Sequence, residues 1–93
     1  MFVGTIQIEL FLSEADSLKG KRFILQSLKK KLRNKFNISI AEIDYHNKWQ
    51  RSHLGIACVS SDRRFIDQVF SKVLNFIDNE NRVEVLDSFV EVL

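Results

Sequence analysis

Hydrophobic and polar positions alternate with a period of two in four segments of the chain. In residues 2–12, four aliphatic residues alternate with mostly polar ones. This period is typical of a strand that buries one face. Three later segments are also predicted to be strands: residues 37–44, 53–60 and 82–93. The alternation slips near Ala41, and again near Asp87 and Ser88, where we expect irregular pairing such as a bulge.

Two other segments repeat their apolar residues at helical spacing. In residues 17–36 the apolar stripe consists of Leu18, Ile24, Leu25, Leu28, Leu32 and Phe36. In residues 63–78 it consists of Phe65, Ile66, Val69, Phe70, Val73, Phe76 and Ile77. Ser17 is a suitable N-cap for the first helix. Asn37 is expected to end it, because Asn tolerates the left-handed conformation.

The predicted elements follow the order β-α-β-β-α-β within a single domain, residues 1–93. This order defines an α+β, ferredoxin-like arrangement, in which two helices cover one face of a four-stranded antiparallel sheet. A polar loop, residues 45–52, joins the second and third strands. Because this fold serves many activities, it does not by itself indicate a function.

Composition excludes several classes of protein. The chain of 93 residues is 45% hydrophobic and 28% charged, as in ordinary soluble domains. We find no signal-peptide pattern and no apolar segment of the roughly 20 residues that a transmembrane helix needs. The single cysteine, Cys58, cannot form an intramolecular disulfide. We therefore expect a cytoplasmic protein that does not contact a membrane.

Positive charge is concentrated in the first helix. Residues 17–35 hold eight of the fourteen Lys and Arg residues and no acid, although the net charge is only +2. Five of these cations fall on one exposed side of the predicted helix: Lys19, Arg22, Lys29, Lys30 and Arg33. Such a surface attracts polyanions or an acidic protein partner. A solvated helix face with no ligand is the alternative interpretation.

The first helical turn places cations where the helix dipole disfavours them. Lys19, Lys21 and Arg22 lie at the positive end of the dipole, which costs about 0.3–1 kcal/mol for each charge. Gly20 in the same turn costs about 1 kcal/mol relative to Ala. An anion held by the free backbone N–H groups and these three cations would remove the penalty.

Topology predicts a basic cluster at one end of the sheet. The start of the first helix, the loop 45–52 and the turn 78–81 should meet there. The expected members are Lys19, Lys21, Arg22, His46, Lys48, Trp49, Arg51 and Arg82. Cations beside an exposed aromatic suit a ligand with phosphates and bases. Trp49 could instead pack over the sheet edge.

Four segments resemble the YlxP-like family of small bacterial proteins: SLKGKR (17–22), LRNKFNISIAEID (32–44), WQRSHLG (49–55) and SSDRR (60–64). The resemblance covers nearly the whole chain. It implies a ferredoxin-like fold and a bacterial cytoplasmic protein. Members are often encoded beside translation and ribosome-maturation factors, which suggests an RNA or ribosome connection. Phe23 departs from the family pattern, in which a basic residue is common.

No catalytic, cofactor or metal site is predicted. His46 and His53 lack the paired ligands of a metal site, and Cys58 is expected to be buried and inert. No Walker or dinucleotide-binding motif is present. The third strand lacks the aromatic residues with which RRM domains stack bases, so binding of that type is disfavoured.

The sequence therefore predicts a non-enzymatic binding domain for RNA or a ribosomal surface. The predicted contacts are Lys19, Lys21, Arg22, Lys29, Lys30, Arg33, Lys48, Trp49 and Arg51. The alternative is a protein–protein interaction or assembly module, which pairs with an acidic partner or forms a homodimer through its open sheet face. A metabolite-binding, ACT-like module shares the fold but has no ligand signature here.

Overall fold

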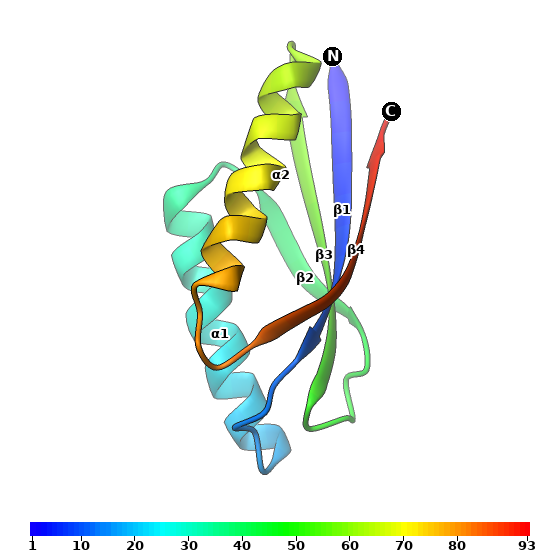
Figure 1. Cartoon of the computed structure of the whole chain (residues 1–93). Helices are drawn as coiled ribbons and strands as arrows, with labels where there is room; N and C mark the ends of the chain where they lie inside the picture. Colours follow the sequence, from blue (N-terminus) through cyan, green and yellow to red (C-terminus); the bar gives the residue numbers. More distant parts are fainter.

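The computed structural model describes residues 1–93 and contains two helices and four strands (Figure 1). The strands are β1 (Phe2–Phe11), β2 (Ser39–Asp44), β3 (Arg51–Ser60) and β4 (Glu84–Val92). The helices are α1 (Leu18–Lys35) and α2 (Arg63–Asp78). The element order is β-α-β-β-α-β, as predicted. Neither α1 nor α2 combines the length and the hydrophobicity of a membrane-spanning segment.

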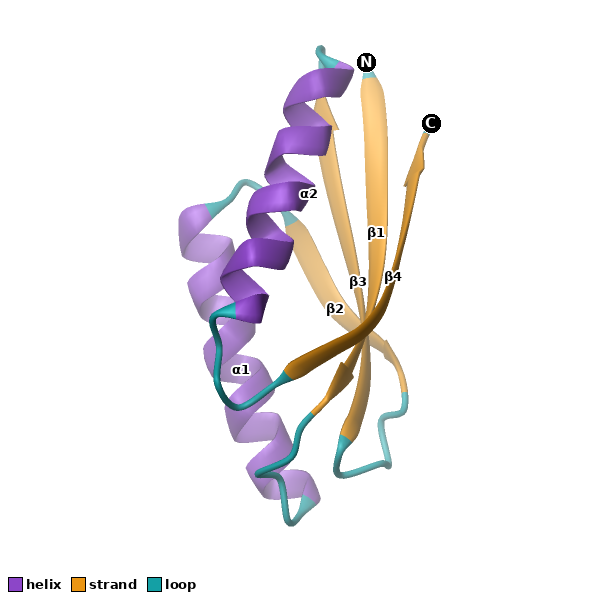
Figure 2. Ribbon diagram, in the orientation of Figure 1, coloured by secondary structure: helices purple, strands orange, loops and turns teal.

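The four strands form one antiparallel sheet in the order β2-β3-β1-β4. Both helices lie on one face of it, and the other face is open (Figure 2). The central strand β1 pairs with β4, which lies at the edge of the sheet. The two chain ends therefore lie side by side, and Leu93 N donates a hydrogen bond to Val3 O at 2.8 Å. The ferredoxin-like prediction is confirmed.

The core lies between the sheet and the helices. Alternate residues of β1 and β3 face the helices and are buried, whereas their neighbours face the open side. Gly4 of β1 faces α2, and a Cβ atom there would collide with the Ile66 side chain. A glycine at this position therefore lets the helix lie close to the sheet.

Two helix ends illustrate where local prediction succeeds and where it does not. The Ser17 hydroxyl caps α1 by accepting a hydrogen bond from Gly20 N at 3.0 Å. The prediction for Asn37 is wrong, because Phe36 ends the helix with extended backbone. The one non-glycine residue with positive φ is Tyr45, at 64°, which begins the loop between β2 and β3.

Two strand boundaries also differ from prediction. β3 begins at Arg51 rather than at residue 53, because Arg51 pairs with Phe11. β4 begins at Glu84 rather than at residue 82, because Val83 N donates to Glu80 O in the preceding turn at 3.2 Å. Alternation misses Arg51 because a polar residue at a strand end looks like loop, and it extends β4 too far because it does not detect the hydrogen-bonded turn.

Register shifts occur close to the expected irregularities. Between Glu42 and Asp44 the pairing of β2 with β3 skips Ile43. Between Asp87 and Val85 the pairing of β4 with β1 skips Leu86. A bulge of this kind increases the local twist of a strand, and both bulges lie on the two edge strands.

Candidate nucleic-acid interface

The exposed side of α1 carries cations that no carboxylate neutralises. None of the five residues that define this basic side is part of an ion pair. They are Lys19, Arg22, Lys29, Lys30 and Arg33. Four of them are exposed, and Lys29 is half-buried. Arg33 also donates to Ile40 O at 3.0 Å, which orients its guanidinium along the β2 edge.

Lys21 does not belong to this basic side, so its predicted exposed role is corrected. Its side chain is 1% exposed, and its ammonium lies 2.9 Å from Glu42 Oε2. It also donates to Tyr45 O at 2.6 Å. Glu42 Oε2 accepts a further hydrogen bond from the buried Ser52 hydroxyl at 2.6 Å. Lys21 is thus a structural cation that ties α1 to the β2–β3 hairpin.

The anion site predicted at the start of α1 is not formed. Lys21 points into the protein, away from Lys19 and Arg22. A Cβ atom added at Gly20 would lie 3.5 Å from Asp16 Oδ1, so a carboxylate already lies beside the first turn. Together with the Ser17 cap, Asp16 supplies the negative group that a ligand would otherwise provide.

The hairpin contributes one free aromatic and one free cation. Trp49 is an exposed residue, with 55% of its surface accessible to solvent. The Lys48 ammonium lies 5.7 Å from the centre of the Tyr45 ring, within the range of a cation–π contact. Neither side chain is part of an ion pair. Lys48 lies over the same Tyr45 ring as Arg51, on the open side of the sheet.

Arg51 is engaged elsewhere, on the open face of the sheet. Its guanidinium pairs with the Glu9 carboxylate, and the same group lies 5.3 Å from the Tyr45 ring centre. The Arg51 hydrogen bond lowers the pKa of Glu9, and Glu9 in turn raises the pKa of the Tyr45 phenol. Arg51 is therefore partly neutralised before any ligand arrives.

Arg82 does not join the basic cluster. It donates to both carboxylate oxygens of Glu80, at 2.8 and 2.9 Å, and to the Ser27 hydroxyl at 3.3 Å. Ser27 lies in the middle of α1, so the α2–β4 turn meets the helix well away from its first turn. The Arg82 pair holds the pKa of Glu80 at about 2.

The remaining candidate residues have ordinary surroundings. Cys58 is buried, as predicted, and burial raises the pKa of its thiol. His46 Nε2 lies 3.2 Å from Glu42 O, and His53 Nε2 lies 3.1 Å from Gln7 Oε1.

Sequence reasoning missed the partners of Lys21, although a signal was present. Lys21 precedes Ile24 and Leu25 by three and four residues, which places it on the apolar stripe of α1. Glu42 follows the buried Ile40 by two residues, so both face the helices. A cation and an acid that both fall on core-facing positions indicate a buried ion pair.

The fold and the surface define a small ferredoxin-like domain with one basic helix. Solved structures with this fold include the de novo designed protein Foldit4, with 15% identity and a TM-score of 0.53 over 100% of this chain and 94% of that one. A second is an antibiotic biosynthesis monooxygenase, with 16% identity and a TM-score of 0.50 over 100% and 96%. At this identity the likeness concerns the fold alone.

The chain belongs to the family described as "Protein of unknown function (DUF503)", whose model matches residues 3–89. It is 42% identical over 82 residues to "Uncharacterized protein YlxP" of Bacillus subtilis (strain 168), and the match covers 88% of this chain and 89% of that relative. The family resemblance inferred from the sequence is confirmed.

Proposed function

We propose that this protein is a non-enzymatic, cytoplasmic binding domain for RNA, with the ribosome as its place of action. The observation that carries the proposal is the basic side of α1, whose five cations form no ion pair. A helix that keeps its charges unpaired retains their full attraction for phosphates, because no internal pair must be broken on binding. The YlxP-like resemblance favours RNA over other polyanions.

The basic side would follow the phosphate backbone, and the hairpin would contact bases. Lys and Arg contacts to phosphates fix the register of a nucleic acid without reading its sequence. Trp49 offers an exposed ring for base stacking, a contact worth about 1–3 kcal/mol per base. Lys48 lies in the same hairpin and supplies a further phosphate contact.

Charge reversal on α1 tests this proposal. The variant Arg22→Glu/Lys30→Glu changes two exposed residues that have no internal partner, so it should fold normally. The control Arg63→Glu/Arg64→Glu makes the same change in net charge at the start of α2. We expect the α1 variant to weaken binding of single-stranded RNA by about tenfold or more in a fluorescence anisotropy titration. The α2 control should change it by less than about threefold. Equal effects of the two variants would contradict the proposal.

A second candidate function, self-assembly, is favoured by the open face of the sheet. Ile43, Val59 and Phe89 expose 48%, 54% and 61% of their surface. A hollow of about 300 Å³ is lined by Ile43 together with the small residues Gly55 and Ala57. Sheets with such a face pack on one another. Light scattering of the purified protein at high micromolar concentration should give a dimer mass, and Val59→Glu should return it to the monomer.

A further inference from the structure

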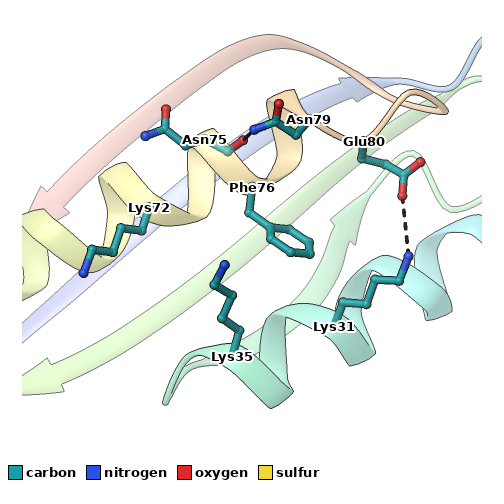
Figure 3. A pocket seen from close by; sticks show the side chains of 7 residues that line it. All are labelled: Lys31, Lys35, Lys72, Asn75, Phe76, Asn79 and Glu80. Carbon is teal, nitrogen blue, oxygen red and sulfur yellow. Dashed lines mark hydrogen bonds and ion pairs between the residues drawn. The ribbon is translucent and has the colours of Figure 1, made fainter.

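A polar groove lies between the C-terminal halves of the two helices, on the side of α1 that faces α2 (Figure 3). Its volume is about 520 Å³, and all but one of its lining residues are polar. They are Lys31, Lys35, Lys72, Asn75, Phe76, Asn79 and Glu80. This volume falls within the range of small-ligand sites, but the lining suits a charged ligand rather than an apolar one.

The groove has more positive than negative charge. Its one carboxylate, Glu80, is already bound through both oxygens by Arg82. The Lys31 ammonium lies 3.9 Å from Glu80 Oε2, at the outer limit of an ion pair. Lys35 and Lys72 have no acidic partner. Three ammonium groups therefore share one carboxylate that Arg82 already neutralises.

The helix dipole accounts for only part of this arrangement. Lys35 lies in the last turn of α1, where the negative end of the dipole stabilises a cation. Lys72 lies in the middle of α2 and gains nothing from that end. It lines the groove together with Lys31 and Lys35, so three like charges lie around one hollow and repel one another. A bound anion would remove this repulsion.

Neutral donors complete the lining. The Asn79 side-chain nitrogen donates to Asn75 O at 2.8 Å, which holds its amide beside the groove. The Lys35 ammonium lies 5.3 Å from the centre of the Phe76 ring. The Lys35 side chain is therefore held over Phe76, the one apolar residue of the lining. Ammonium and amide N–H groups are the donors that phosphate oxygens accept.

We infer that this groove binds a run of two or more phosphate groups, contacted by Lys31, Lys35 and Lys72 with the amides of Asn75 and Asn79. As a site for the RNA backbone it rests on the proposed function, and it would extend the basic side of α1 around the helix toward α2. A free triphosphate presents the same chemistry, so the two sources need separate tests.

The test follows the side-chain amide signals of Asn75 and Asn79 by nitrogen-15 NMR, during titration with inorganic triphosphate and separately with single-stranded RNA. The groove variant is Lys35→Gln/Lys72→Gln. The control, Arg63→Gln/Arg64→Gln, also removes two exposed cations, but at the other end of α2. We expect both probes to shift the two amide signals in the wild type and the control. In the groove variant the apparent affinity for either probe should fall about tenfold, and the salt slope for RNA by roughly 1.4.

The outcomes separate this inference from the proposed function. Unmoved Asn75 and Asn79 signals with both probes would overturn the groove, even if RNA binds at α1. Shifts with triphosphate alone would support the groove as a phosphate site and count against RNA binding. Equal loss in the groove variant and the control would indicate a general charge effect and overturn the inference.

Discussion

Lys19 and Lys21 are two residues apart in one helical turn, yet they have opposite roles. Two residues correspond to about 200° around a helix, so the side chains point to opposite sides. Lys19 faces solvent without a partner, whereas Lys21 is buried against Glu42 and the Tyr45 carbonyl. The comparison shows that the availability of a cation depends on its position relative to the apolar stripe. A count of basic residues in a helix therefore overstates its binding surface.

The largest effect is expected from Lys21. The substitution Lys21→Met keeps the apolar stem but removes the ammonium that Glu42 and the Tyr45 carbonyl share. It should lower the free energy of unfolding by about 3 kcal/mol, because an uncompensated charge is left nearly buried. Urea denaturation measures the change. The matched control Lys19→Met should stay within about 0.5 kcal/mol of the wild type.

A second substitution sharpens this result. Adding Glu42→Gln to Lys21→Met removes the unpaired charge, so the double variant should recover part of the lost stability. A double variant that is less stable than Lys21→Met alone would contradict this account, because it would show that the Glu42 charge does not depend on Lys21 for its stabilisation.

A smaller effect is expected at Glu80, the other carboxylate that an arginine neutralises. Arg82 lowers the pKa of Glu80 from its usual value of 4.5 to about 2 in the folded protein. A lowered folded-state pKa stabilises the fold above pH 4.5, and this contribution disappears as the pH falls toward 2. Allowing for solvent screening, about 2 kcal/mol should be lost in that window. Urea denaturation as a function of pH, with Glu80→Gln as the comparison, checks this; the variant should show a flatter profile.

The smallest effect is expected at Lys19. No acid lies in the first turn of α1, so Lys19→Glu should raise the free energy of unfolding by about 0.5 kcal/mol through the helix dipole. The same variant should bind RNA more weakly than the wild type. Thermal unfolding and anisotropy on one sample measure both quantities. A loss of stability would indicate an unrecognised role of Lys19 in the fold.

Most of the fold could be predicted from the sequence, because the two hydrophobic periods are clear and no competing pattern is present. The hairpin was harder. Ser52 looks like loop but is fully buried, since it lies in β3, pairs with Leu10 of β1 and donates to Glu42. Tyr45 adopts a left-handed conformation that its residue type disfavours. The hydrogen bond that its carbonyl accepts from Lys21 joins distant parts of the chain, so local sequence does not predict it.

The candidate site could be predicted only in part. The spacing within α1 identified the five cations of the basic side. The polar loop left open whether Trp49 is exposed or packed over the sheet edge. The groove was not predicted, because Lys35 and Lys72 are 37 positions apart in the chain and only the packing of α2 beside α1 brings them to one groove. The sequence likewise did not predict that Arg51 and Arg82 are neutralised, because this depends on where the fold places Glu9 and Glu80.

The salt dependence of RNA affinity tests the central claim most directly. The five cations on the basic side of α1 form no ion pair, and if each contacts one phosphate, log affinity should fall with log salt with a slope of about −3.5 or steeper for a single strand. Arg22→Glu/Lys30→Glu should reduce that slope by roughly 1.4 or more. A slope near zero, or one that the double variant leaves unchanged, would contradict the account.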